Sequence, residues 1–341
     1  MTPSRYTTFT PLLSAAAAEA MLGLCERFGS YGMYGQEPIR EELGRGLYQR
    51  HDAAMNFIRS GGRLGRQESF ESLAVRTNYF RETYAYAEPV VPGIAGFLWH
   101  EGFVEAARVL YGRPVIAPAI VYANLLVPGQ ELAVHTDVPE FRGANRTKDP
   151  EWLLVVMHHS GLFAPWRMPI ATGVAWFRGC RGGEFAFYPD GAARPPAVLA
   201  AAHNTAVLLD TDSTFHGVDR VAETAEPLPP LAIGMRLTFE GSERWRVGFG
   251  DEAGEAHQAV VRYTWDDIRF SVSLKAYCYT DEAERRMVEE HTDDLTRARI
   301  MDTLLADLRR RGRLGDTLPG GTDLALLMID EYIRFPAPAI A

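Results

Sequence analysis

The stretch YANLLVPGQELAVHTD, residues 122–137, decides how the rest of the chain is interpreted. It predicts one strand, a Pro-Gly turn at 128–129 and a second strand that ends near His135 and Asp137. Side chains two positions apart on a strand point to the same side, so both can bind one metal ion. We therefore predict a metal site at His135 and Asp137.

A second His-Thr-Asp tripeptide occupies residues 291–293. It lies within a charged run, 281–312, that predicts one long helix. Residues two positions apart on a helix point in nearly opposite directions and cannot chelate one ion together. No histidine follows His291 in the chain. We therefore expect this copy to be a solvated helix face with no metal.

A metal site with open positions typically takes two histidines and one carboxylate on one face of the ion. The third ligand must then come from a histidine beyond residue 137, and five precede the predicted C-terminal helix: His158, His159, His203, His216 and His257. The first two fall on a helix that we predict from Asp149 as N-cap and Pro150 as first residue. A packing or capping role is the expectation for them. His203 lies in a turn, and His216 in a β-rich run.

The β-rich part of the chain predicts the fold class. From residue 114 onward, short β-rich runs alternate with Pro and Gly, which favours a sandwich or jelly roll over a βαβ fold. We predict an α+β protein with a double-stranded β-helix (jelly-roll) core and helical extensions at both ends. Residues 1–113 would be mainly helical and pack on the barrel, 114–240 would form the catalytic core, and 241–341 would add strands and C-terminal helices. Ser14 is expected to cap a first helix over 14–28.

Composition excludes several partners. The chain has 341 residues, 47% of them hydrophobic, and a net charge of −9. It carries no basic stripe of the kind that follows a phosphate backbone, so we expect no nucleic acid. No apolar run is long enough to span a membrane. Three separated cysteines predict neither a disulfide framework nor a cysteine zinc site, and a cytoplasmic location is expected. Nothing in the sequence indicates the oligomeric state.

Around the first tripeptide, the order of motifs resembles that of the iron(II)- and 2-oxoglutarate-dependent dioxygenases, in the prolyl-hydroxylase-like and phytanoyl-CoA-hydroxylase-like branches. The resemblance covers residues 102–240. It rests on the stretch 122–137 and on four others, which are GFVEAARVLYGRP (102–114), CRGGEFAFYPDG (180–191), NTAVLLDTDSTFHGV (204–218) and GMRLTF (234–239). The resemblance implies Fe(II) as cofactor, 2-oxoglutarate as co-substrate and O2 as oxidant.

Carried onto this sequence, the resemblance gives each matching residue a role. It implies that His135, Asp137 and His216 bind iron. It implies that Arg236 and Thr238 hold the far carboxylate of 2-oxoglutarate. Arg220 is a rival for that anchor, although we expect it to form a rim ion pair with Asp219 or Glu223. The remaining candidates are weaker: Tyr122 and Asn124 for contact with co-substrate or substrate, Gly182 and Gly183 for a tight turn, and Arg76, Asn78 and Arg81 for a substrate lid.

The expected activity is oxidation of a small-molecule substrate, such as an amino acid or a biosynthetic intermediate, coupled to decarboxylation of 2-oxoglutarate. Hydroxylation is the default outcome, and desaturation or ring formation would use the same residues. The carboxylate of Asp137 argues against halogenation, because halogenases of this family lack it. The alternative is a cupin-like jelly roll that binds a metal or a sugar and does not use 2-oxoglutarate.

Overall fold

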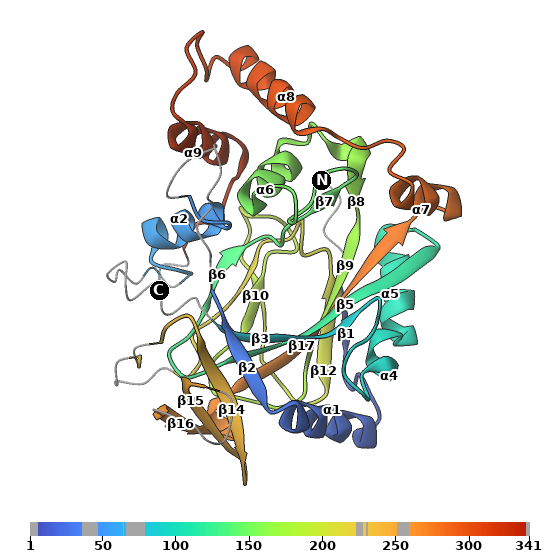
Figure 1. Cartoon of the computed structure of the whole chain (residues 1–341), viewed down its shortest axis with the longest axis vertical. Coiled ribbons are helices and arrows are strands. Elements are labelled where there is room, and N and C mark those ends of the chain that lie inside the picture. The colour runs from blue at the N-terminus through green and yellow to red at the C-terminus, as the bar shows by residue number, and fades with distance from the viewer. Residues whose placement is uncertain are drawn as a thin grey trace.

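The computed structural model describes residues 6–35, 47–63, 65, 79–222, 228–229, 231–250 and 259–338 (Figure 1). The helices are α1 (Ala15–Phe28), α2 (His51–Ser60), α4 (Ala95–Leu98), α5 (Glu101–Tyr111), α6 (Glu151–Ser160), α7 (Glu282–Glu289), α8 (Arg297–Arg310) and α9 (Gly321–Tyr332), with 3-10 turns η1 (Ala164–Trp166) and η2 (Trp265–Asp267). The strands up to His135 are β1 (Tyr6–Phe9), β2 (Ser30–Tyr34), β3 (Tyr79–Tyr86), β4 (Glu88–Pro89), β5 (Val115–Leu126) and β6 (Leu132–His135). The later strands are β7 (Glu140–Phe141), β8 (Arg167–Met168), β9 (Ile170–Trp176), β10 (Phe185–Phe187), β11 (Ala197–Leu199), β12 (Thr205–Leu209), β13 (His216–Val218), β14 (Met235–Gly241), β15 (Arg244–Phe249), β16 (Ala259–Thr264) and β17 (Arg269–Tyr279).

Among the described residues, most strands belong to one large antiparallel sheet. Its order is β1-β12-β9-β17-β5-β3-β2-β14-β15-β16, with β4 paired to β3. A smaller antiparallel sheet, β11-β10-β13-β6, carries both histidines of the predicted site. Trp176 and Val207 of the large sheet pack with Phe185 and Val218 of the small one. The two sheets therefore face each other across an apolar layer.

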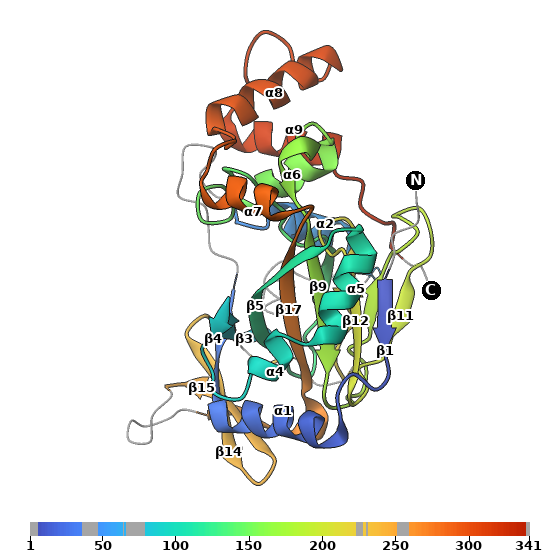
Figure 2. The same ribbon diagram turned by 90° about the vertical axis from the view of Figure 1, so that its right-hand side faces the viewer.

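Helices cover the sheet face opposite to that layer and the top of the molecule. Figure 2 shows α1, α4 and α5 against the large sheet, and α6 to α9 above it. Met21 of α1 and Phe103 of α5 belong to the same core as Val121 of β5 and Val272 of β17. A separate core joins α6, α8 and α9, as Leu154, Leu304 and Met328 pack together. The mixed helix and sheet architecture matches the predicted α+β class.

Several predicted elements are confirmed. The side-chain oxygen of Ser14 accepts from the backbone N–H of Ala17 and caps α1, as the sequence predicted. Helices over 101–111 and 151–160 are present, but the N-cap of α6 is Pro150 rather than Asp149. In the N-terminal region, which was predicted to be mainly helical, α2 begins at His51.

Two features of the fold differ from the sequence predictions. The run 281–312 is two helices, because the chain turns between Glu290 and Thr296 and His291 adopts a φ of 55°. The side chain of Thr296 accepts from the N–H of Arg299 and starts α8 anew.

No described helix is both long and apolar enough to cross a bilayer.

The second difference concerns the boundary that was predicted at residue 240. Strand β17 lies beyond it, yet β17 pairs with both β9 and β5 at the centre of the large sheet. The N-terminal part, which was predicted to be mainly helical, contributes β1, β2 and β3 to the same sheet. The sheet that backs the site is therefore assembled from all three predicted regions.

Candidate metal centre

Two paired strand ends bring the two histidines together. In the antiparallel pair of β6 and β13, His135 lies directly opposite His216, and the centroids of their rings are 4.5 Å apart. Asp137 follows β6, and its backbone N–H donates to the carbonyl of Thr211 at 2.9 Å. This bond fixes the turn of the chain after the strand. The three ligand atoms offered by these side chains all lie within 4.8 Å of one another.

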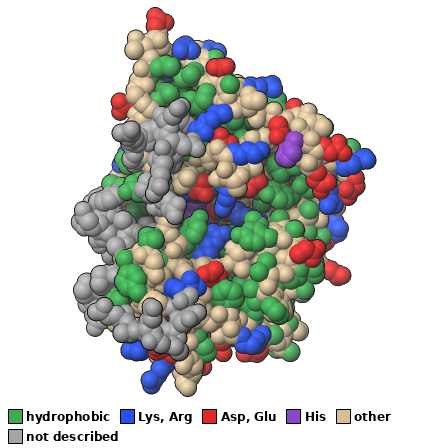
Figure 3. All heavy atoms as spheres, viewed as in Figure 1, with side chains coloured by type: hydrophobic (Ala, Val, Ile, Leu, Met, Phe, Trp, Pro, Cys, Tyr) green, Lys and Arg blue, Asp and Glu red, His purple; other side chains and the backbone are tan. Residues whose placement is uncertain are grey.

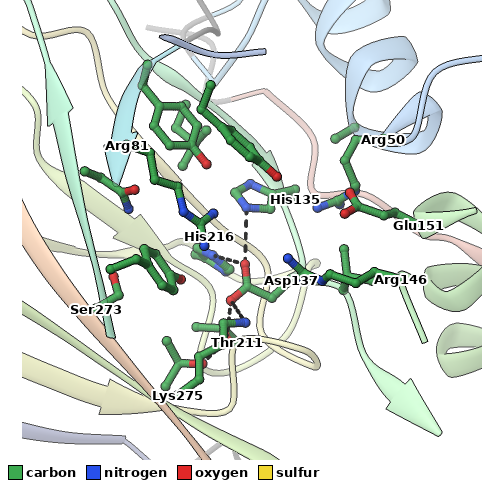
Figure 4. Close-up of a pocket in the computed structure, with 18 of the residues that line it drawn as sticks. Arg50, Arg81, His135, Asp137, Arg146, Glu151, Thr211, His216, Ser273 and Lys275 are labelled. Carbon is green, nitrogen blue, oxygen red and sulfur yellow. Dashed lines mark hydrogen bonds and ion pairs between the residues drawn. The ribbon is translucent and has the colours of Figure 1, made fainter. Parts of the chain in front are cut away.

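The two carboxylate oxygens of Asp137 have different surroundings (Figure 4). Oδ1 lies 3.6 Å from Nε2 of His135 and 3.6 Å from Nε2 of His216. Oδ2 accepts from the hydroxyl of Thr211 and from Nζ of Lys275, each at 2.7 Å. One oxygen therefore faces the two imidazoles, while the other is held in place by the protein.

The hydrogen bonds of the His135 and His216 rings use Nδ1 and leave Nε2 available to a metal. Nδ1 of His135 lies 2.6 Å from the carbonyl of Ala133, and Nδ1 of His216 lies 2.9 Å from the carbonyl of Thr214. Because a carbonyl only accepts, each neutral ring carries its proton on Nδ1 and keeps a lone pair on Nε2. The Nε2 atoms face Asp137, so two imidazole nitrogens and one carboxylate oxygen point toward one position.

The protonation states suit a metal at neutral pH. Burial, with a further contribution from His216, lowers the pKa of His135 to about 4. Burial alone would raise the pKa of Asp137, but Lys275 and the two histidines hold it well below its usual value. A neutral imidazole and an ionised carboxylate are the forms that bind divalent ions.

A cavity of about 780 Å³ lies in front of these three residues, between the two sheets. Tyr122 and Asn124, which the sequence placed on one face of a strand, both line it from β5. Arg81 of β3 also lines it, whereas Arg76 and Asn78 lie outside the described residues. In Figure 3, Lys and Arg side chains gather around a hollow near the middle of the visible face.

Strand β17 supplies a row of polar side chains that the sequence analysis missed. Arg269, Ser271, Ser273 and Lys275 are spaced two apart, and all four line the cavity. Their signal was present in RFSVSLKAY (269–277), where polar residues alternate with Phe270, Val272 and Leu274. That alternation predicts a strand, but the run lies in 241–341, outside the region that was predicted to form the catalytic core.

Arg269 is buried without a carboxylate partner. Only 2% of the residue is exposed, and burial lowers its pKa to about 10. Nε donates to the carbonyl of Gly183 at 2.7 Å, and Nη1 donates to the hydroxyl of Ser271 at 3.2 Å. Among the described residues no carboxylate lies within 4.0 Å of it, and Nη2 has no partner. A buried cation in this state is suited to binding an anion.

The neighbours of Arg269 restrict and complete this end of the cavity. Gly183 has a φ of 67°, and a Cβ there would lie 2.8 Å from Cδ of Arg269, so only glycine fits. Its partner Gly182 has a φ of 66°, and a Cβ there would meet the carbonyl of Arg220 at 2.4 Å. Asn124 is paired with Ser271 across the β5–β17 ladder, and its Oδ1 is buried without a partner.

The expected anchor of the resemblance does not lie at the cavity. Arg236 and Thr238 are on β14, which is four strands from β17 in the large sheet. Arg236 binds Ser30 through Nε at 2.8 Å and lies 3.1 Å from the Glu82 carboxylate, while Thr238 hydrogen bonds to Ser30. Neither lines the cavity. The prediction that Arg236 and Thr238 lie beside the metal site is corrected, because β14, β15 and β16 form an extension of the sheet before β17 returns to its centre.

The remaining candidates have structural partners. Arg220 forms the expected rim ion pair, but with Glu131 at 3.0 Å; Asp219 pairs with Arg63, and Glu223 is outside the described residues. His203 binds the Phe177 carbonyl through Nδ1.

The second tripeptide also has local partners. His291 lies 3.1 Å from Asp294, and Asp293 pairs with Arg142 at 2.8 Å. Its residues are not on a helix, so the geometric reason given for excluding a metal was wrong. Among the described residues, the one cluster of three or more potential metal ligands is the first tripeptide with His216.

The chain matches no family model and no curated protein sequence. Solved structures similar to it include an oxidoreductase of the 2OG-Fe(II) oxygenase family from Burkholderia pseudomallei, at 13% identity and a TM-score of 0.39, over 80% of this chain and 84% of that one. The α-ketoglutarate-dependent epimerase SnoN from nogalamycin biosynthesis is 10% identical, with a TM-score of 0.40, over 81% and 77%. HygX from Streptomyces hygroscopicus, with nickel, 2-oxoglutarate and hygromycin B bound, is 9% identical, with a TM-score of 0.38, over 81% and 84%.

Proposed function

We propose that the chain is an Fe(II)- and 2-oxoglutarate-dependent oxygenase that oxidises a small molecule. One observation carries the proposal: a two-histidine, one-carboxylate set faces the same cavity as a buried arginine that has no carboxylate partner. Two histidines and one carboxylate are the ligands that hold non-haem iron and leave coordination positions open. A buried arginine without a carboxylate partner can bind one carboxylate of a dicarboxylate co-substrate. On this proposal, the two facing sheets are the halves of a double-stranded β-helix.

The residues present fit a divalent iron ion. His135 and His216 would bind it through Nε2, and Asp137 through Oδ1. Lys275 and Thr211 occupy Oδ2 of Asp137, so they would keep the carboxylate monodentate and preserve open positions on the metal. Iron bound there would supply the oxidising chemistry with oxygen and 2-oxoglutarate. The protein's own contribution is to orient these groups and to exclude water between the sheets.

We assign the 2-oxoglutarate anchor to β17 in place of β14. Arg269 presents a planar donor fork, remains charged when buried and has one amino group free, so it can bind a carboxylate through charge-assisted bonds. Ser271 and Asn124 lie beside it and can complete the site. The apolar side chains Leu126, Val174, Phe185 and Val218 line the cavity between the two ends, which suits the methylene carbons of the co-substrate.

The reaction outcome is proposed as hydroxylation, with desaturation or ring closure using the same residues. Asp137 supplies the carboxylate ligand that halogenases of this family lack, so halogenation is not proposed.

The test is iron-dependent formation of succinate from 2-oxoglutarate by the purified chain. We expect succinate with Fe(II), none after chelation, and recovery when Fe(II) is returned. The His216→Ala variant, checked for folding by circular dichroism, is the matched control and should form none. A cupin-like protein would bind metal through the same three side chains and form no succinate, so that result would reject the proposal.

A further inference from the structure

The charge of the cavity lining is opposite to that of the chain. Five cationic side chains line it, namely Arg50, Arg81, Arg146, Arg269 and Lys275, whereas three carboxylates do, those of Asp137, Glu140 and Glu151. The whole chain carries a net charge of −9. A cavity that concentrates positive charge within an acidic protein favours an anionic ligand.

Three of the five cations already have a role. Arg50 pairs with Asp52 at 2.9 Å, and Lys275 pairs with Asp137 at 2.7 Å. Arg269 is proposed above to bind the co-substrate. Arg81 and Arg146 remain, and among the described residues neither has a carboxylate within 4.0 Å. Their positive charge is therefore available to a ligand that is not 2-oxoglutarate.

Arg81 lies over two tyrosine rings, which restrict the orientation of its guanidinium. Its guanidinium carbon lies 3.7 Å from the centroid of the Tyr122 ring and 5.0 Å from that of Tyr34. Contact of this kind restricts the plane of the guanidinium while its N–H groups stay in that plane. Arg81 is therefore oriented before any ligand arrives.

Arg146 approaches the same space from the other side. It lies in the loop between β7 and α6, and Figure 4 shows Arg81 and Arg146 pointing toward the metal residues from opposite sides. Burial and, to a smaller extent, Arg81 act to lower the pKa of Arg146, but the Glu151 carboxylate and Tyr34 outweigh them and hold it above its usual value, so the two guanidinium groups lie close enough to repel each other. An oxyanion between them would relieve that repulsion and receive donors from both.

We infer that the substrate oxidised at this site is a small organic acid whose carboxylate binds between Arg81 and Arg146. That the bound acid is oxidised rests on the proposed function. That the cavity binds such an acid does not. Four of the tyrosine rings that line the cavity, those of Tyr34, Tyr79, Tyr122 and Tyr277, would contact the apolar body of the molecule. Glu140 and Glu151 share the lining, and their negative charge favours a monoanion such as a carboxylate over a phosphate dianion.

The test is calorimetric binding of matched pairs, each an arylalkanoate and its primary amide, starting with 3-phenylpropanoate and 3-phenylpropanamide and lengthening the chain. In each pair the two molecules share a shape and differ in charge. We expect at least one acid to bind roughly tenfold more tightly than its amide, as one charge-assisted contact allows. Arg81→Gln and Arg146→Gln should each reduce that preference to about threefold or less, and Arg81→Lys should retain part of it. Arg108→Gln, on the outer surface of α5, is the control and should change nothing.

Three results would overturn the inference. They are equal binding of acid and amide in every pair, a preference that survives both Arg81→Gln and Arg146→Gln, and a preference that is lost only in Arg269→Gln. The last would place the acid at the end assigned to 2-oxoglutarate. Because these titrations need neither iron nor turnover, they are independent of the succinate assay, and a failure of one is distinguishable from a failure of the other.

Discussion

Each half of the candidate site has a second copy elsewhere in the chain, and the copies lie in different surroundings. His-Thr-Asp occurs at 135–137 and at 291–293, and Arg-x-hydroxyl, which is found at several places in the chain, includes the expected anchor at 236–238 and the pair at 269–271. The copies at 135–137 and 269–271 line the cavity between the two sheets. The other two are tied to neighbouring side chains, Asp293 to Arg142 and Arg236 to Ser30 and Glu82. Strand pairing therefore decides which copy of each motif faces the cavity.

The largest difference is expected between the two tripeptides. His135→Ala and His216→Ala should each abolish stoichiometric iron binding, because either change leaves two of the three ligands. His291→Ala should leave the metal content at its wild-type value, since that side chain contacts Asp294 on the surface. The measurement is iron content after reconstitution and desalting. Retained iron in His216→Ala, or lost iron in a folded His291→Ala, would break the comparison.

The second largest difference is expected between Arg269 and Arg236, in the concentration of 2-oxoglutarate that the enzyme requires. Arg269→Gln should raise the half-saturating concentration of 2-oxoglutarate by at least tenfold, because charge-assisted bonds contribute roughly 1.5–3 kcal/mol each. Arg236→Gln should leave it near the wild-type value, because Arg236 binds Ser30 and Glu82 outside the cavity. The two variants are compared by titrating 2-oxoglutarate against succinate formation. The opposite order would return the anchor role to β14.

The smallest difference is expected between the hydroxyl groups of Ser271 and Thr238, again in the requirement for 2-oxoglutarate. Ser271→Ala should weaken 2-oxoglutarate by about 1 kcal/mol, the value of one neutral hydrogen bond. Thr238→Val should leave the co-substrate unaffected and act only on folding, where the lost bond to Ser30 contributes a similar amount. Succinate titrations and denaturant unfolding separate the two effects. If Thr238→Val changed the co-substrate requirement and Ser271→Ala did not, β17 would lose its assigned role.

The sequence predicted which three side chains would lie together, because two of them depend on local geometry. His135 and Asp137 belong to one strand end, and the order of motifs then selected His216 from five later histidines. The anchor could not be found in the same way. Arg236 and Arg269 each precede a hydroxyl residue by two positions on a strand, and only the pairing of β17 with β5 and β9 shows which of them faces the cavity. The extension formed by β14 to β16 placed a similar motif earlier in the chain.

The break near residue 291 was missed for a related reason. The charge pattern of residues 281–312 is compatible with one continuous helix. Only Thr296, which is the N-cap of α8, indicates that a second helix begins there. The sequence predicts Arg81 as a candidate, but its contacts with the rings of Tyr122 and Tyr34 depend on how the neighbouring strands pair. The sequence alone therefore predicts candidate side chains, and the pairing of strands that are distant in the chain decides which of them face the cavity.

The most direct measurement is a crystal structure of the chain with 2-oxoglutarate and nickel(II), an inert stand-in for iron. We predict metal bound by Nε2 of His135, Oδ1 of Asp137 and Nε2 of His216, with the far carboxylate of 2-oxoglutarate on Arg269 and Ser271. A metal bound elsewhere, or a co-substrate whose far carboxylate lies on Arg236, Arg81 or Lys275, would contradict this account.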